Sequence, residues 1–77
     1  MPRNPRDTVA LQRLGGVIVR HRITSGLTQE SVAEDAGLSV QFIRRVERGS
    51  GNPSYLSILA IARALKLPAE QIVREAL

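Results

Sequence analysis

Apolar residues recur along this chain at the three- to four-residue spacing of amphipathic helices, and no stretch alternates convincingly with a period of two. Glycines, prolines and capping residues interrupt the pattern and divide it into five short segments. No low-complexity segment or internal repeat is visible. The pattern therefore predicts an all-α fold built from five short helices.

The beginning of the chain lacks this pattern. Its first six residues contain two prolines and two arginines without periodicity, so we expect residues 1–7 to form a flexible basic arm in front of a single domain, residues 8–77. Asp7 or Thr8 is suited to cap the first helix. The predicted buried stripe of that helix consists of Leu11, Leu14, Val17 and Ile18.

Two adjacent glycines lie in the middle of the predicted first helix. Gly15 and Gly16 each cost up to about 1 kcal/mol relative to alanine in a helix interior. Two explanations are open at this point. Either another backbone approaches the helix closely here, or the helix extends only from Gly16 to Ser25.

The clearest local signals surround two helices in the middle of the chain. Thr28 is a favourable N-cap for the first of them, and Gly37 suits the left-handed conformation that ends it. Ser39 can cap the next helix, which we expect from Val40 to about Arg48 with Gly49 after it. These signals predict a short helix, a tight turn and a second short helix.

Two further helices complete the predicted fold. Ser54 can cap the fourth, after a loop-forming stretch, and Pro68 suits the first turn of the fifth. The fourth helix has predicted buried positions at Leu56, Leu59, Ala60, Ala62 and Leu65. The apolar residues of the fifth helix are Ile72, Val73, Ala76 and Leu77.

Composition excludes several kinds of chemistry. The 77 residues suffice for one small domain, and the absence of cysteine excludes disulfides, cysteine-ligated zinc, iron–sulfur clusters and thiol catalysis. His21 is the only histidine and the carboxylates are scattered, so neither a nucleophile with its base nor a metal cluster can be assembled. We expect no enzymatic activity, no cofactor, no metal and no small-molecule ligand. No apolar run approaches the roughly 18 residues of a membrane span, so we expect a cytoplasmic protein.

Charge adds an indication of an anionic partner. Eleven Lys and Arg residues against seven Asp and Glu residues give a net charge of +4, and all but Lys66 of the eleven are arginine. If Ile43 and Val46 mark the buried side of the third predicted helix, its polar residues fall near the opposite side at 100° per residue. These residues are Gln41, Arg44, Arg45 and Arg48. Such a face is typical either of a solvated helix surface or of a surface that binds nucleic acid.

Residues 29–48, QESVAEDAGLSVQFIRRVER, resemble the helix-turn-helix of the lambda-repressor and Cro type, the XRE family. Ala33 is the small residue on the first helix, and Gly37 occupies the turn. The flanking segments LGGVIVRHRITSGLTQE, IRRVERGSGNPS and LAIARALKLPAE are also similar to the family, so the resemblance covers about Leu14 to Ile72. It implies a compact five-helix lambda-repressor-like DNA-binding domain in which helices 2 and 3 form the helix-turn-helix.

The resemblance also implies roles for individual residues. Family positions that face DNA bases are occupied here by Ser39, Val40, Gln41, Arg44 and Arg45. Family positions that contact phosphates are occupied by Gln29, Arg48, Ser50 and Asn52. Arg22 and Glu47 match positions that form a structural ion pair. Val40 and Arg44 depart from the family, which often has a polar residue at the former and a small one at the latter, so no relative's sequence preference can be transferred.

The chemistry of these residue types suits double-stranded DNA. Glutamine pairs with adenine and arginine with guanine in bidentate geometry, and Val40 suits a thymine methyl group. We therefore expect a sequence-specific double-stranded DNA-binding transcriptional regulator without an effector domain. Length and layout slightly favour a restriction-modification controller over a phage-type repressor or the antidote of a toxin pair. The competing class is a protein-interaction module on the same fold, which would lack arginine and glutamine on the third helix.

We further expect a homodimer. One recognition helix reads only a few base pairs, so this architecture generally doubles its reading by twofold symmetry on an inverted-repeat operator. The last predicted helix offers the interface, because a domain this small cannot bury all the apolar residues there, namely Ile72, Val73, Ala76 and Leu77. The alternative is that Ile72 and Val73 cover the core and only Leu77 is exposed.

Overall fold

Five helices and no strands make up residues 4–77, the part of the chain that the computed structural model describes. The helices are α1 (Pro5–Thr24), α2 (Gln29–Ala36), α3 (Val40–Arg48), α4 (Tyr55–Ala64) and α5 (Ala69–Ala76). The prediction of an all-α, five-helix fold is confirmed. None of these helices is long and apolar enough to cross a membrane, and residues 4–77 hold no group of His, Asp or Glu side chains arranged to bind a metal ion.

The first helix begins earlier than the sequence pattern predicts. Asn4 is its N-cap, with the side-chain oxygen accepting from the backbone N–H of Arg6 at 2.8 Å, and Pro5 occupies the first helical position. The predicted caps Asp7 and Thr8 are therefore wrong, and the expected arm over residues 1–7 is wrong for residues 5–7, which are helical. Asn4 of that arm is the N-cap just described, and residues 1–3 lie outside the described residues.

The caps in the middle of the chain are those that the sequence predicts. The Thr28 hydroxyl accepts from the backbone N–H of Ser31 at 3.0 Å, which begins α2, and Ser39 begins α3 in the same way. Gly37 and Gly49 end these two helices with φ values of 69° and 75°, a left-handed conformation that glycine adopts without steric strain. Local chemistry therefore fixes the bounds of both helices.

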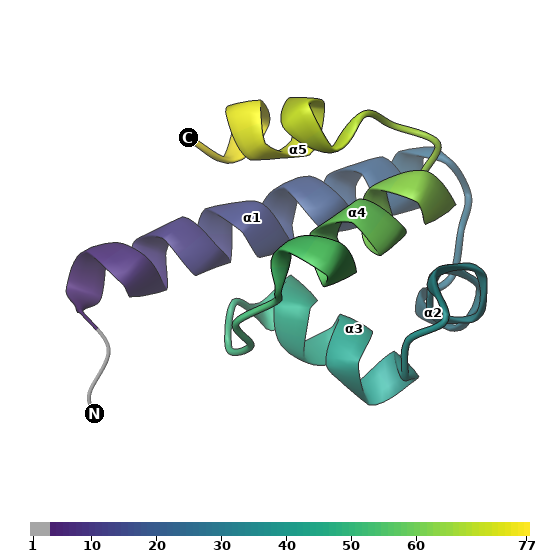
Figure 1. The fold of residues 1–77 in the computed structure, drawn as a ribbon, viewed down its shortest axis with the longest axis horizontal. Helices are drawn as coiled ribbons and strands as arrows, with labels where there is room; N and C mark the ends of the chain where they lie inside the picture. The colour runs from purple at the N-terminus through teal and green to yellow at the C-terminus, as the bar shows by residue number, and fades with distance from the viewer. Residues whose placement is uncertain (1–3) are drawn as a thin grey trace.

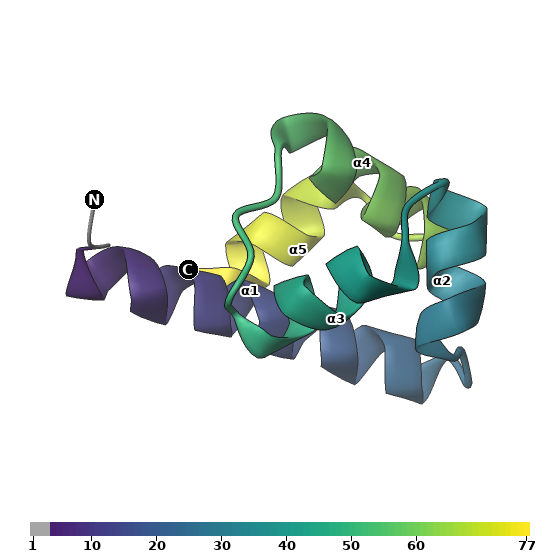
Figure 2. The same cartoon turned by 90° about the horizontal axis from the view of Figure 1, so that it is seen from below.

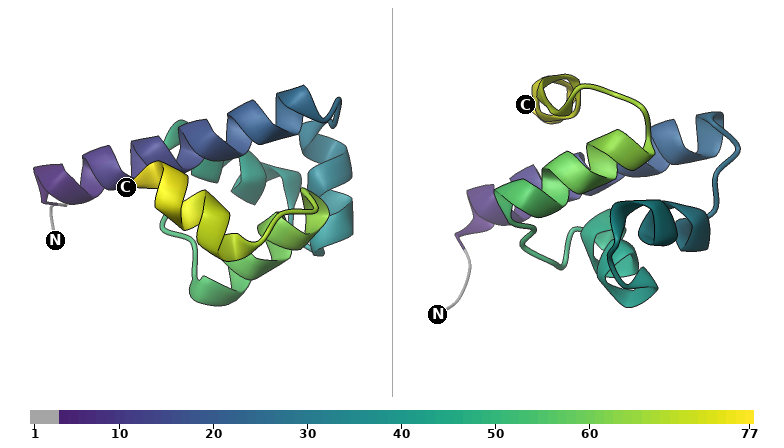
Figure 3. Two further views of the ribbon diagram at one scale, coloured as in Figure 1. Left: turned by 90° about the horizontal axis from the view of Figure 1, so that it is seen from above. Right: turned by 45° about the vertical axis from the view of Figure 1, so that its right-hand side comes forward.

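Helix α1 is the longest helix, and α3 and α5 pack directly against it. Helix α5 packs along one side of α1 and α3 along the other, while α4 contacts α2 and α5 (Figure 1). Seen from below, α3 lies in front of α1 and α5 (Figure 2). The core consists of Leu14, Val17, Ile18, Val32, Ala33, Ile43, Val46, Ile61, Ala62, Ala64, Leu65 and Ile72. The first turns of α1 extend beyond the other helices (Figure 3).

The two glycines of α1 have different environments. A Cβ atom on Gly15 would lie 2.5 Å from the carbonyl oxygen of Val46 and 2.6 Å from that of Glu47, so α1 and the backbone of α3 are in direct contact here. A Cβ atom on Gly16 would meet nothing within 4 Å. The helix continues through both residues. Of the two explanations from the sequence, close approach of another backbone is therefore correct.

Of the five positions predicted to be buried in α4, Ala62 and Leu65 lie in the core, Leu59 and Ala60 are only half-buried, and Leu56 is wrong. Leu56 is 73% exposed, whereas Ile61 is fully buried. Leu56 precedes Ile61 by five residues, which places the two side chains about 140° apart around the helix. The start of α4 at Tyr55 and Leu56 thus faces solvent, and its fully buried positions begin at Ile61.

Candidate nucleic-acid interface

The turn between α2 and α3 orients the third helix. The backbone N–H of Leu38 donates to the carbonyl of Ala33 at 2.9 Å, across the left-handed Gly37, which is the hydrogen bond of a Schellman motif. Ala33 is 4% exposed, so its small side chain is buried in the core. Only three residues separate the two helices. This arrangement is a helix-turn-helix, and the prediction that helices 2 and 3 form it is confirmed.

Helix α3 has two chemically different sides. Ile43 and Val46 are buried, with exposed fractions of 0% and 2%. The exposed polar residues of the helix are Gln41, Arg44, Arg45 and Arg48. Since no acidic side chain of α3 lies among them, the outer side of this helix attracts anions.

The position of α3 against α1 is fixed by an ion pair between Arg22 and Glu47. Nε of Arg22 donates to Oε2 of Glu47 at 2.7 Å, and Nη2 donates to Oε1 at 3.1 Å, a bidentate geometry. The side chains are 14% and 5% exposed. The remaining amino group of Arg22 donates to the carbonyl of Leu27 at 3.0 Å. The structure thus contains the ion pair that the sequence predicts, and the pair is part-buried between the two helices.

Gln29 extends this network from α3 to α2. Its Nε2 donates to Oε1 of Glu47 at 2.9 Å, and its Oε1 accepts from Nε of Arg44 at 3.3 Å. The family resemblance implies a phosphate contact for Gln29 and base reading for Arg44. In the free protein these two side chains contact each other, and Arg44 also donates to Oε2 of Glu30 at 3.2 Å. Sequence reasoning missed Glu30, because only the packing of α2 against α3 brings it to Arg44.

The other residues expected to face bases differ in their surroundings. The hydroxyl of Ser39 accepts from the backbone N–H of Phe42 at 3.1 Å, so it caps α3. Val40 is half-buried against the core. Gln41 and Arg45 are exposed, and within residues 4–77 their side chains make no hydrogen bond. These two side chains are free to bind an external ligand.

The residues expected to contact phosphates, apart from Gln29, follow one another along the chain. Arg48 is exposed at the end of α3. The hydroxyl of Ser50 donates to the carbonyl of Arg45 at 3.2 Å, which shapes the loop after the helix. Asn52, also exposed, lies beside Asp7 of α1 at a small cavity of about 280 Å³. Arg48 and Ser50 therefore lie at the end of α3, whereas Asn52, in the same loop, lies against the first turns of α1.

On the other side of α1, Glu75 fixes α5. Nε2 of Gln71 donates to its Oε2 at 2.9 Å, and Nε2 of His21 lies 2.8 Å from its Oε1, where Arg20 also donates. These hydrogen bonds, first that from Gln71 and then those from His21 and Arg20, lower the pKa of Glu75 from its ordinary value of 4.5 to about 2. The only histidine of the chain thus takes part in a structural contact.

The expected dimer surface on α5 needs a correction. Ile72 is fully buried and belongs to the core, because it lies on the side of α5 that faces the rest of the domain. Val73 and Leu77 are 43% and 86% exposed, and Ala76 is half-buried. The exposed apolar surface therefore consists of fewer α5 residues than the sequence predicts.

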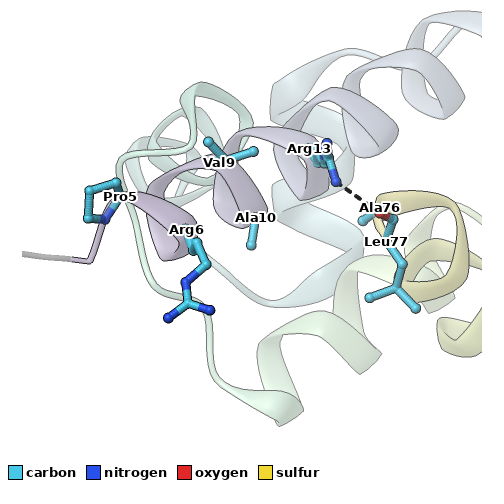
Figure 4. Close-up of a pocket in the computed structure, with 7 residues that line it drawn as sticks. All are labelled: Pro5, Arg6, Val9, Ala10, Arg13, Ala76 and Leu77. Atoms are coloured by element: carbon cyan, nitrogen blue, oxygen red, sulfur yellow. Dashed lines mark hydrogen bonds between the residues drawn. The ribbon is translucent and has the colours of Figure 1, made fainter.

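This surface continues onto α1. A groove of about 460 Å³ lies between the two helices. Figure 4 shows its lining, with Val9 and Ala10 on one side and Ala76 and Leu77 on the other. Nη1 of Arg13 donates to the carbonyl of Leu77 at 2.9 Å across it. Val9 is 45% exposed. Sequence reasoning missed this half of the surface, because only the packing of α5 along α1 brings Val9 and Ala10 next to Ala76 and Leu77.

Comparison with known proteins places the chain in a family. Residues 18–72 match the family model described as helix-turn-helix. The chain belongs to the helix-turn-helix family. It is 35% identical to the HTH-type transcriptional regulator y4dJ of Sinorhizobium fredii over 60 residues, which are 78% of each chain. It is 45% identical over 49 residues to an HTH-type transcriptional regulator of Methanothermobacter thermautotrophicus, covering 64% of this chain and 71% of the other.

Solved structures of helix-turn-helix proteins share the fold. The restriction-modification controller protein C.AhdI of Aeromonas hydrophila superposes with a TM-score of 0.79 at 34% identity, covering 80% of this chain and 94% of that one. The controller protein C.Esp1396I, as a tetramer in complex with its natural 35 base-pair operator, has a TM-score of 0.77 at 28% identity, covering 87% and 93%. With its regulator relatives, this makes the chain a helix-turn-helix DNA-binding transcriptional regulator of the XRE type.

Proposed function

We propose that this protein recognises a specific sequence of double-stranded DNA by placing α3 in the major groove. The observation that carries the proposal is the outer side of α3, where Gln41 and Arg45 have no partner within residues 4–77. The part-buried ion pair of Arg22 and Glu47 fixes this helix against α1. An α-helix fits a groove about 12 Å wide, and rigid donors lose less entropy when they bind.

The side chains of α3 and the following loop divide into two roles in this proposal. Gln41 and Arg45 read base edges, because an amide and a guanidinium make bidentate contacts with adenine and guanine. Val40 contacts a thymine methyl group beside them. Arg48, Ser50 and Asn52 bind phosphates, since they lie at the end of α3 and in the loop after it. Base contacts then give the sequence preference, and phosphate contacts give the register.

The working unit in this proposal is a homodimer on an inverted repeat. A second copy covers Val73 and Leu77 of α5 and the adjoining groove at Val9, which together form an exposed apolar surface. Twofold symmetry then places two α3 helices about 34 Å apart, so the half-site centres are separated by about 10 base pairs. The operator complex of C.Esp1396I contains a tetramer of that related protein.

We infer that the protein acts as a restriction-modification controller. This chain covers 94% of C.AhdI at 34% identity, and the two share the arrangement of helices with a TM-score of 0.79. A regulator of this kind acts by occupying or flanking a promoter. The inference concerns the biological system, and the DNA-binding mechanism does not depend on it.

Selection from a random pool tests the proposed function. Purified protein is incubated with randomised duplexes, and bound DNA is recovered and sequenced over several rounds. We expect enrichment of one inverted repeat, with half-site centres about 10 base pairs apart. The variant Arg45→Ala, treated identically, serves as the control and should lose the preference at one position of each half-site. If bound and input pools have the same sequences, the domain does not read bases and the proposal is wrong.

A further inference from the structure

The contacts of Arg44 all involve one edge of its guanidinium group. Nε donates to Oε1 of Gln29 at 3.3 Å, and Nη2 donates to Oε2 of Glu30 at 3.2 Å. Nε and Nη2 lie on the same side of the planar group, so α2 binds this side in a fork-like geometry. The two acceptors come from adjacent residues in the first turn of α2.

The orientation of Gln29 is itself fixed. Its amide nitrogen donates to Oε1 of Glu47 at 2.9 Å, and Glu47 is held by Arg22 through contacts of 2.7 and 3.1 Å. Because the nitrogen faces Glu47, the amide oxygen faces Arg44. A continuous series of contacts therefore connects the rigid ion pair of α1 and α3 to the exposed guanidinium of Arg44.

The other edge of Arg44 is available. The Arg44 side chain is 44% exposed, and Nη1 has no hydrogen-bond partner within residues 4–77. The edge formed by Nη1 and Nη2 carries two parallel N–H donors. This is the geometry that pairs with the O6 and N7 atoms of guanine in the major groove. An unrestrained arginine would lose much side-chain entropy on forming this pair, whereas a side chain held at its opposite edge loses less.

We propose that Glu30 and Gln29 are positioning residues, which hold Arg44 from α2 so that its Nη1 and Nη2 atoms read a guanine. This inference rests on the proposed function and adds a determinant of specificity to it. The Glu30 carboxylate also repels DNA phosphates, and because this repulsion is the same on every duplex, it lowers affinity without changing base preference.

The test compares Glu30→Gln with a matched variant. Glu34 is an exposed acidic residue on the same helix, and its side chain makes no hydrogen bond within residues 4–77. Glu34→Gln therefore removes the same charge without touching Arg44. Fluorescence anisotropy gives the affinity of each variant for the selected operator and for duplexes in which one base pair at a time is replaced. We expect Glu30→Gln to reduce the preference for guanine at one base pair by about two- to fivefold, as for the loss of an exposed ion pair. Glu34→Gln should leave that preference unchanged.

A double variant separates positioning from a general charge effect. Arg44→Ala should lose the preference at the same base pair, and adding Glu30→Gln to it should change nothing further there. The inference is overturned if Glu30→Gln and Glu34→Gln change the affinity for every duplex by one common factor. It is also overturned if the effect of Glu30→Gln persists in the Arg44→Ala background. A wild-type protein with no preference among duplexes would instead contradict the proposed function, so the two failures are distinguishable.

Discussion

Substitution of the two adjacent glycines of α1 by alanine should have opposite effects on stability. At Gly15 the new methyl group would lie 2.5 and 2.6 Å from two carbonyl oxygens of α3 and 2.9 Å from a carbonyl carbon. All three atoms belong to the backbone, so no side-chain rotation relieves the overlap. Helix α3 must move away from α1 by about 0.9 Å to restore ordinary van der Waals contact. Such overpacking costs about 1–3 kcal/mol.

The helix propensity of alanine offsets part of this cost. It returns up to about 1 kcal/mol, so Gly15→Ala should lower the free energy of unfolding by about 0–2 kcal/mol when this return is complete. At Gly16 no atom lies within 4 Å of the new methyl group, so Gly16→Ala should raise it by up to about 1 kcal/mol. Urea unfolding followed by circular dichroism measures both. The explanation of Gly15 as a point of helix contact is refuted if Gly15→Ala raises the free energy of unfolding as much as Gly16→Ala does.

Three further outcomes are expected. Glu47→Ala leaves the largely buried Arg22 without its partner, so urea unfolding should show a free energy of unfolding lower by about 3 kcal/mol. A loss below about 1 kcal/mol would mean that the pair behaves as an exposed one. The pKa of Glu75 is about 2 in the folded protein and 4.5 ordinarily, so its contribution to stability is present above about pH 4.5 and is lost as the pH falls toward 2. Melting temperatures over this range should fall less steeply for Glu75→Gln, and identical slopes would contradict the assignment. Leu77→Asp or Val73→Asp should give a monomer in sedimentation at tens of micromolar, while the melting temperature stays near that of the wild type. An unchanged dimer would exclude this surface as the interface.

The middle of the chain is predictable because its signals are local. Thr28, Gly37, Ser39 and Gly49 act within one turn of their own positions, and each has the predicted conformation or cap. The signal for the start of α1 is equally local, since Asn4 is the N-cap and Pro5 the first helical residue. The prediction of an arm over these residues is wrong because it does not use this signal. The capping signal of Asn4 and Pro5 is present in the sequence, but the prolines and arginines around these residues are also typical of an arm.

Other features depend on packing between distant segments and leave no local signal. Ile72 and Leu56 both fit the apolar spacing of a helix, so the spacing does not distinguish a buried residue from an exposed one. The packing of α5 and α4 on the domain decides that Ile72 is buried and Leu56 exposed. The contact of Glu30 with Arg44 joins residues 14 positions apart on two helices. A helical projection treats each helix alone, so it places Arg44 on the outer side of α3 without showing that α2 holds it.

The central claim is that α3 reads bases through Gln41 and Arg45, and the affinity of single variants for the selected operator tests it most directly. Arg45→Ala or Gln41→Ala should lose about 1–3 kcal/mol on the operator and relax the preference at one base pair, with little change on random DNA. Arg48→Ala is the matched control: it should weaken binding to all duplexes alike and reduce the salt dependence by about one phosphate contact. If Arg45→Ala weakens operator and random DNA by the same factor, as Arg48→Ala does, then α3 does not read bases through this residue.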